Sequence, residues 1–376
     1  MTPSLRRIAV IAGEASGDLH GASLIKHLRS LSREGLEIYG IGGDKIRETG
    51  ALGFFDLAHF HVTGITDAIK RYPQYKKAAA VILGNIRKVR PDLVVLIDNP
   101  GFNLHLAEKI HALGIPVVYY IAPQVWAWAP RRVLKIKKFV SKVLVVFEFE
   151  KKIYEQNGIA VQWVGHPLKD LITSQTAGPH KTNGGPVISL LPGSRKGELK
   201  MLFSVFTQAA RLISAELPGV SFNLIKAPTL PASFYERLLQ CCELDIRLIE
   251  EDSYAAIRSS DLAIACSGTA TLECALLGTP MIIANRGTWI TYLAAKLLIQ
   301  VPFLGLPNLI LGQKKFPELL QFDATGEKIA AEALRILRNP GTMAQMKKDL
   351  EEVSRRLGEG GASKRTAEEV LKILGS

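Results

Sequence analysis

Short apolar runs alternate with amphipathic stretches along this chain. In the first half, runs rich in Val, Ile and Leu predict strands at residues 6–12, 37–40, 93–97, 117–121, 143–146 and 161–164. Helical periodicity between these runs predicts helices such as residues 21–32, 75–89 and 104–113. Because the runs are continuous rather than alternating, the strands should be buried on both faces, which is typical of a parallel sheet between helices.

This rhythm breaks once, at residues 171–186, which are rich in Ser, Thr, Gly and Pro and read as a linker. It resumes with strands expected at residues 187–191, 221–225, 246–248, 262–265 and 281–284. The pattern therefore predicts an α/β protein with two Rossmann-like, doubly wound domains, residues 1–170 and 187–350. We expect a last helix, at about residues 360–376, to pack back on the first domain.

Length and composition agree with two folded domains. The chain has 376 residues, of which 47% are hydrophobic and 22% charged. It opens with MTPSLRR and passes directly into an apolar strand, so we expect no secretory signal. None of the four cysteines forms a CxxC pair, and we expect them to be reduced, as in the cytoplasm.

The net charge of +12 lies mainly in the first half, where residues 1–168 carry 23 Lys and Arg against 14 Asp and Glu. Such a surface attracts nucleic acid, an anionic membrane or a phosphorylated substrate. No nucleic-acid-binding motif accompanies it, so we expect no nucleic-acid partner. The alternative is a solvated basic face without a specific partner.

In open α/β sheets, ligands bind outside the carboxyl ends of the strands. The first such loop, AGEASGD at residues 12–18, lacks the GxGxxG spacing, and its carboxylates Glu14 and Asp18 would repel a pyrophosphate. They suit sugar hydroxyls or acid–base chemistry better. The alternative is helix capping by Ser16 or Asp18.

A second loop, LIDNPGFN at residues 96–103, places Asp98 at the carboxyl end of a predicted strand. A carboxylate there could accept a proton from an attacking hydroxyl. The alternative is that Asp98 only caps the helix that follows Pro100.

The third loop, APQVWAWAPRR at residues 122–132, holds Trp126 and Trp128. They could stack on a ring, support the wall of the site, or simply pack in the core. Six cations fall within residues 131–142, beginning with Arg131 and Arg132, and they suit an anionic partner.

The second domain has two loops suited to a nucleotide. In LLPGSRKGE, residues 190–198, Gly193 and Ser194 can offer backbone N–H groups and Arg195 a phosphate clamp. In CSGTATLE the turn Ser267, Gly268 and Thr269 can reach a diphosphate, while Glu273 suits ribose hydroxyls. The alternative for Glu273 is a first-turn charge on the helix macrodipole. No DxD motif appears, so we expect no metal and no cofactor.

Taken together, the motifs resemble the lipid-A-disaccharide synthases, inverting glycosyltransferases of the GT-B fold. The matching stretches, in order along nearly the whole chain, are IAGEASGD, IDNPGFN, YIAPQVWAW, FEK, VGHP, LLPGSR, SGTATLE and LPNL. The resemblance implies two domains facing across a cleft. It also implies transfer from UDP-2,3-diacylglucosamine to 2,3-diacylglucosamine 1-phosphate, giving the β-1,6-linked lipid A disaccharide 1-phosphate and UDP.

The resemblance also implies roles for individual residues. Asp98 corresponds to the candidate base, Glu14 to a residue needed for activity, Arg195 to the diphosphate clamp and Asn308 of LPNL to an active-site Asn. The family is peripheral to the inner face of the cytoplasmic membrane, and some members form homodimers. In this chain IDNP replaces the commoner IDAP or IDSP, which leaves the Asp in place.

A more polar segment, residues 61–82, stands where relatives have a hydrophobic, membrane-dipping helix. Its apolar face predicts interfacial binding beside nearby cations, and the alternative is a helix packed on the sheet. The residues expected at the acceptor or membrane are Val62, Ile65, Ile69, Lys70, Arg71, Arg131 and Arg132. The rival functions are another GT-B transferase of the UDP-GlcNAc type, a UDP-GlcNAc epimerase, and a basic binding protein without catalysis.

Overall fold

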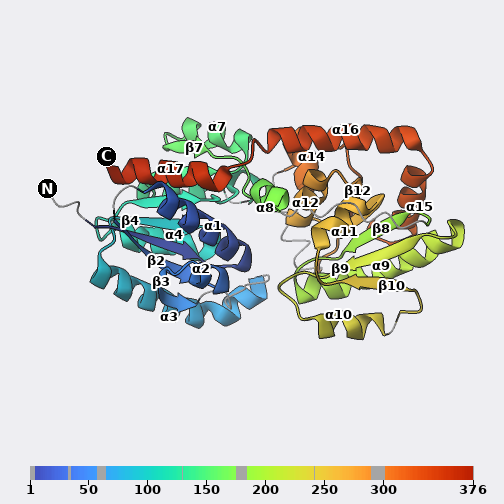
Figure 1. Ribbon diagram of the computed structural model, residues 1–376, viewed down its shortest axis with the longest axis horizontal. Coiled ribbons are helices and arrows are strands. Elements are labelled where there is room, and N and C mark those ends of the chain that lie inside the picture. Colours follow the sequence, from blue (N-terminus) through green and yellow to red (C-terminus); the bar gives the residue numbers. More distant parts are fainter. Residues whose placement is uncertain are drawn as a thin grey trace. The chain divides into compact units, whose positions relative to one another are not determined.

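The computed structural model describes residues 5–32, 35–56, 65–128, 130–174, 184–240, 242–288 and 301–375. The chain divides into two compact units, one formed by residues 1–170 with 357–376 and the other by residues 171–356. Each unit is built around its own parallel sheet, with helices between successive strands (Figure 1). Two parallel α/β sheets confirm the predicted fold class.

Unit 1 contains a seven-stranded sheet in the order β3-β2-β1-β4-β5-β6-β7, and every neighbouring pair is parallel. Its strands are β1 (Arg6–Ala12), β2 (Leu36–Gly42), β3 (Leu52–Asp56), β4 (Leu93–Ile97), β5 (Val117–Tyr120), β6 (Lys142–Val145) and β7 (Val161–Trp163). Its helices are α1 (Ala15–Leu31), α2 (Asp44–Glu48), α3 (Ile65–Val89), α4 (Pro100–His111), α5 (Val125–Trp128), α6 (Arg132–Phe139), α7 (Glu148–Gln156), α17 (Ala362–Gly375) and the first turn of α8 (Leu168–Ser174).

Unit 2 repeats this arrangement with six strands in the order β10-β9-β8-β11-β12-β13, again all parallel. Its strands are β8 (Val187–Leu191), β9 (Ser221–Ile225), β10 (Ile246–Ile249), β11 (Leu262–Cys266), β12 (Met281–Asn285) and β13 (Glu318–Leu320). Its helices include α9 (Lys196–Glu216), α10 (Ala232–Leu239), α11 (Ser253–Ser259), α12 (Thr269–Leu277), α14 (Leu306–Leu311), α15 (Gly326–Leu337) and α16 (Pro340–Arg356).

The central strands of both sheets are buried on both faces, as their unbroken apolar sequences predict. All five residues of β4 and the last five of β1 have no exposed surface, and β11 is buried throughout. Burying this much aliphatic surface is the main favourable contribution to folding. The middle of each sheet is therefore the rigid part on which the loops at the carboxyl edge are mounted.

Each sheet reverses its strand order once, between β1 and β4 in unit 1 and between β8 and β11 in unit 2. At such a switch point the connections leave toward opposite sides, so the two loops at the carboxyl ends diverge and leave room for a ligand. The loops that follow these four strands contain residues 12–18, 96–103, 190–198 and 266–273, the stretches whose sequences predict ligand-binding loops.

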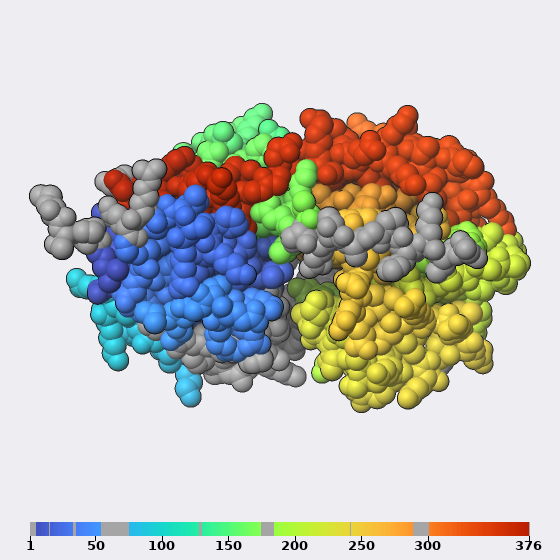
Figure 2. Space-filling model, in the orientation of Figure 1, coloured from blue at the N-terminus to red at the C-terminus, as the bar shows by residue number. Residues whose placement is uncertain are grey.

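The last helix, α17, belongs to unit 1 and lies along α1 (Figures 1 and 2). The carboxylate of Asp170 holds its N-terminus by accepting hydrogen bonds from Gly361 N, at 2.5 Å, and Ser363 N, at 3.1 Å. The guanidinium of Arg365 donates to the carbonyl oxygen of Val164 at 2.8 Å. The C-terminal segment is thus an integral part of the first unit.

The structure differs from the sequence-based expectations chiefly at the starts of helices. Helix α1 begins at Ala15 rather than residue 21, and α4 begins at Pro100 rather than residue 104. Their first turns, ASGD in α1 and PGFN in α4, show no regular apolar period. Strands β3 and β13 were not predicted, because each is a short edge strand, LGFFD and ELL, without a continuous run of Val, Ile and Leu.

Among the described helices, none combines the length and apolar character needed to cross a bilayer.

Candidate functional site

A pocket of about 310 Å³ lies at the switch point of unit 2, between the ends of β8 and β11. It brings together two loops that are some 70 residues apart in the sequence. Seven of the predicted nucleotide-binding residues line it, namely Gly193, Ser194, Arg195, Ser267, Gly268, Thr269 and Glu273.

Two glycines in unusual backbone conformations line this pocket. Gly193 has φ +113° and Gly268 has φ +132°, in the region that side-chain-bearing residues rarely adopt. Gly268 is the N-cap of α12 and Arg195 the N-cap of α9, and neither helix has a side-chain cap. Two helix N-termini therefore open onto the pocket, and their N–H groups and dipoles favour an anion such as a diphosphate.

The guanidinium of Arg195 stands at the mouth of the pocket, about half exposed, and Nη1 donates to Glu198 Oε1 at 2.9 Å. Glu198 fits beneath the turn only because residue 193 is a glycine: a Cβ there would lie 2.9 Å from Glu198 Oε2. Arg195 and Glu198 thus pair with each other on the lining of the pocket. Lys226 adds a second cation to the lining.

Glu273 lies deeper in the pocket, on the second turn of α12. Tyr254 Oη donates to Glu273 Oε1 at 3.3 Å, and burial raises the pKa of the Glu273 carboxyl above its usual value. The first turn of α12 has no acidic residue, so Glu273 is not a macrodipole charge. Its side chain is therefore placed to accept hydrogen bonds from ligand hydroxyls. Tyr254 was missed by the sequence analysis, because no motif marks it.

Asn308 does not line this pocket and is fully buried on α14. Its Nδ2 donates to Phe316 O and to Glu318 Oε1, both at 2.8 Å, and its Oδ1 accepts from Lys315 N and Phe316 N. All the hydrogen-bonding capacity of the amide is used inside the fold. In this structure Asn308 organises the segment from α14 to β13.

At the switch point of unit 1, the loops after β1 and β4 touch. A Cβ on Gly13 would lie 2.4 Å from Asn99 Nδ2, so the first loop passes directly against the second. Glu14, the N-cap residue of α1, is partly buried beside this contact and makes no side-chain cap hydrogen bond. The structure therefore brings Glu14 and the Asp98–Asn99 turn to the same edge of the sheet.

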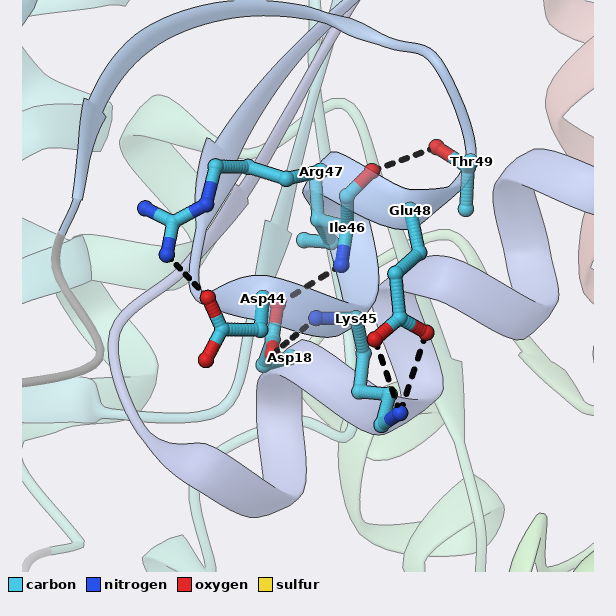
Figure 3. Close-up of polar contacts among 7 residues, drawn as sticks. All are labelled: Asp18, Asp44, Lys45, Ile46, Arg47, Glu48 and Thr49. Carbon is cyan, nitrogen blue, oxygen red and sulfur yellow. Dashed lines mark hydrogen bonds and ion pairs between the residues drawn. The ribbon is translucent and has the colours of Figure 1, made fainter.

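Asp18, the other carboxylate of the first loop, has a structural role (Figure 3). It is buried, and it accepts hydrogen bonds from Gly43 N at 2.8 Å, Lys45 N at 3.0 Å and Ile46 N at 3.1 Å. Three backbone N–H groups at the start of α2 are thereby satisfied by one carboxylate. The capping alternative holds for Asp18, but the helix that it caps is α2.

Asp98 follows β4 in a left-handed backbone conformation, with φ 50°, and Asn99 continues it with φ 44°. The N-cap of α4 is Asn99, so Asp98 is not the capping residue that the alternative interpretation required. Its side chain is partly buried at the carboxyl edge of the sheet. Asp and Asn adopt this conformation more readily than other non-glycine residues, so the local strain is at the lower end of the usual range of about 1–3 kcal/mol per residue.

The loop after β5 is anchored to α7. Trp126 Nε1 donates to Glu150 Oε1 at 2.9 Å, its ring packs edge-on against Phe149, and Tyr154 Oη donates to Pro123 O at 2.8 Å. Glu150 is buried, and the loss of hydration raises its pKa to about 7. These contacts favour the packing interpretation of Trp126. The side chain of Trp128 lies outside the described residues.

The predicted membrane-facing residues are only partly described. Arg131 is exposed at the start of α6, and Arg132 is partly buried, which lowers the pKa of its guanidinium. Val62 and the side chains of Ile65, Ile69, Lys70 and Arg71 lie outside the described residues. Within the described part of the chain, no three His, Cys, Asp or Glu side chains converge as metal ligands do.

Comparison with known proteins places this geometry in a family. The lipid-A-disaccharide synthetase (LpxB) family matches residues 8–373. A lipid-A-disaccharide synthase of Trichlorobacter lovleyi is 38% identical over 375 residues, covering 98% of both chains. That of Myxococcus xanthus is 37% identical over 374 residues, covering 98% of this chain and 97% of its own.

Solved structures share the fold at low identity. The chain superposes on a UDP complex of MnaA from S. aureus with a TM-score of 0.71 and 14% identity, covering 99% of this chain and 97% of that one. It superposes on the spinosyn forosaminyltransferase SpnP with a TM-score of 0.64 and 13% identity, covering 99% and 100%. At these identities the likeness concerns the fold alone. By its near-complete family match and its full-length relatives, the chain belongs to the lipid-A-disaccharide synthetase family and has that family's glycosyltransferase activity in lipid A biosynthesis.

Proposed function

We propose that the donor is UDP-2,3-diacylglucosamine and the acceptor 2,3-diacylglucosamine 1-phosphate. The acceptor 6-hydroxyl oxygen attacks the anomeric carbon of the donor, the bond from that carbon to the diphosphate breaks, and UDP leaves with inversion. One proton leaves the hydroxyl and must be taken up by a base. The products are the β-1,6-linked disaccharide 1-phosphate and UDP.

The unit 2 pocket supplies what the leaving group needs. The diphosphate lies at the N-termini of α9 and α12, with Arg195 neutralising charge that develops as the bond breaks. Glu273 accepts hydrogen bonds from the ribose hydroxyls. The observation that carries this assignment is that one pocket unites the GSR turn and the SGT turn with Glu273, from distant parts of the chain.

Asp98 is the base in this proposal. It is a carboxylate at the switch point of unit 1, held in a strained turn, and strain of this kind gathers at functional sites. Glu14 lies at the same edge and is assigned to binding acceptor hydroxyls. Asn308, whose amide is fully occupied, acts by shaping the segment that follows β12 rather than by touching UDP.

A transfer assay tests the proposal. Radiolabelled donor and acceptor are mixed with the full chain in detergent micelles, with and without a chelator, and the lipid products are separated. A labelled disaccharide 1-phosphate is expected. UDP released without disaccharide would instead indicate an epimerase or hydrolase. UDP binding without any turnover would indicate that the acceptor is not the one proposed.

We also propose that the protein works at the inner face of the inner membrane, where its lipid substrates reside. The cations at the start of α6, Arg131 and Arg132, support this through attraction to anionic headgroups. Sedimentation with vesicles tests it. Binding to vesicles of anionic phospholipid that weakens with added salt is expected, and equal binding to vesicles of neutral lipid would contradict it.

A further inference from the structure

Three residues with a left-handed backbone conformation lie at neighbouring strand ends in unit 1. Among the described non-glycine residues, Asp98 (φ 50°), Asn99 (φ 44°) and Ile121 (φ 55°) have positive φ at the ends of β4 and β5, which pair with each other. Asp and Asn tolerate this conformation, whereas a β-branched residue is a true outlier. Strained residues at two adjacent strand ends persist only where the surroundings hold them.

The backbone of Asp98 is held by two buried side chains. Its carbonyl oxygen accepts from Tyr119 Oη at 2.6 Å and from Asn103 Nδ2 at 2.7 Å, and Nδ2 also donates to Ile97 O at 3.0 Å. The backbone N–H of Asp98 donates to the carbonyl oxygen of Tyr120 at 3.1 Å. Tyr119 and Asn103 have no exposed surface. Every polar backbone atom of Asp98 is therefore fixed from inside the unit.

Keeping Asn103 at this position carries a cost. Within the described structure its Oδ1 is buried and has no hydrogen-bond partner. A buried acceptor without a partner is rare and calls for an explanation. An apolar residue of similar shape would avoid the unpaired oxygen. What the amide adds is the two hydrogen bonds that its Nδ2 donates.

The phenol of Tyr119 remains a donor under working conditions. Burial, reinforced by the nearby charge of Asp98, raises the pKa of its hydroxyl well above the usual value. From the opposite side, Gly13 leaves the space that Asn99 fills, since a Cβ would lie 2.4 Å from Asn99 Nδ2. The turn is thus held by hydrogen bonds on one side and by close packing on the other.

We propose that Tyr119 and Asn103 are positioning residues for the transfer reaction: by clamping the Asp98 carbonyl they hold the strained turn that presents the Asp98 carboxylate. The inference rests on the proposed role of Asp98 as the base. Neither residue touches substrate, so their loss affects the chemical step and leaves substrate binding intact.

The test uses two nearly isosteric variants of the full chain, Tyr119→Phe and Asn103→Leu. Each is expected to lower kcat by about 10- to 100-fold, the range for misplacing a catalytic group by up to an ångström, with KM for both substrates little changed. Tyr154→Phe is the matched control. It removes another buried tyrosine hydroxyl that donates to a backbone carbonyl, that of Pro123 instead of Asp98.

Stability separates positioning from a structural role. Tyr119→Phe and Tyr154→Phe should lower the Tm by similar amounts, while only the first lowers kcat. Asn103→Leu should lower kcat while lowering the Tm no more than Tyr119→Phe does, because the loss of its two donated hydrogen bonds is offset by the removal of the unpaired Oδ1. If Tyr119→Phe does not fold, Asn103→Leu alone carries the comparison.

Double variants with Asp98→Asn complete the test. Because the clamp acts through Asp98, adding Tyr119→Phe or Asn103→Leu to Asp98→Asn should cause no further loss. Losses that multiply, or single variants with unchanged kcat, overturn the clamp while the role of Asp98 stands. Full turnover by Asp98→Asn itself overturns the base assignment and the clamp together.

Discussion

The two sheets use the same strand order, yet their switch points are built differently. At the switch point of unit 2 the residues with positive φ are Gly193 and Gly268, which carry no side chain and line the pocket. In unit 1 the corresponding turn is formed by Asp98 and Asn99, which keep their side chains in a conformation that costs free energy.

The difference follows from what each edge has to present. An anion is bound well by backbone N–H groups at helix ends, and glycine allows these groups to approach without strain. In the proposed mechanism the proton acceptor must be a side chain, so glycine cannot serve there, and the Asp98 carbonyl oxygen accepts from the buried donors Tyr119 and Asn103. In this proposal, an edge that binds an anion and an edge that presents a base differ in the free energy that their backbone conformations cost.

The largest effect is expected from Asp98→Asn. Replacing the carboxylate by an isosteric amide keeps the turn but removes the proton acceptor, and kcat should fall by about 10²- to 10⁴-fold. Transfer rates at saturating substrates measure this. Calorimetry with UDP should give an unchanged affinity, because the proposed nucleotide pocket lies in the other unit; a matching loss of UDP affinity would contradict the proposed division of roles.

A pH effect on stability is expected from Glu150 in unit 1. Its pKa rises from 4.5 to about 7 on folding because it is buried, so the folded state binds a proton that the unfolded chain has released. The stability contributed by the protonated form is complete below pH 4.5 and is lost between pH 4.5 and 7, by of order 3 kcal/mol.

Glu150→Gln removes this titration. Its Tm should be lower than that of the natural protein at pH 5, because an amide cannot accept from both Trp126 Nε1 and Phe147 N. The difference should shrink or reverse by pH 8. Thermal unfolding of both proteins from pH 5 to 8 checks this, and parallel curves would show that the Glu150 carboxyl does not titrate in that window.

Arg195→Ala tests the anion pocket of unit 2. It should weaken UDP binding by about 1.5–3 kcal/mol, the range for a charged hydrogen bond, and the half-exposed guanidinium favours the lower end. Arg211→Ala is the control, because Arg211 pairs with Glu243 and does not line the pocket. Equal affinity of both variants for UDP would remove Arg195 from the clamp.

The smallest effect is expected from two glycines four residues apart. Gly193→Ala should lower stability by about 1–2 kcal/mol and weaken UDP binding, because φ is +113° and the new Cβ would lie 2.9 Å from Glu198. Gly197→Ala, in the first turn of α9 with no atom near its Cβ position, should raise stability by about 0.4–1 kcal/mol. Chemical denaturation and UDP titration of both variants measure this contrast.

Much of the fold could be predicted from the sequence, because parallel sheets need strands that are apolar on both sides. The predicted ranges for β1, β4, β8 and β9 agree with the structure residue by residue. The failures have a physical pattern. Helix starts such as ASGD and PGFN show no regular apolar period, and the edge strands β3 and β13 are too short to show one.

The candidate site divides in the same way. Residues in contiguous glycine-rich turns, such as Gly193 and Gly268, could be found by their local pattern, and the pocket unites them. The residues that support the candidate site could not be identified from the sequence. Tyr119 reads as an ordinary strand residue and Tyr254 as an ordinary helix residue, and only the tertiary structure shows their hydroxyls reaching Asp98 and Glu273.

The return of α17 to unit 1 has a consequence for synthesis. Unit 2 is one continuous stretch of chain, whereas unit 1 lacks α17 until the residues that follow unit 2 have been made. Until then the face of α1 that packs against α17 remains exposed, and the Asp170 carboxylate lacks the N–H groups of Gly361 and Ser363. Of these two units, the one that comes first along the chain is therefore completed only after the other has been synthesised.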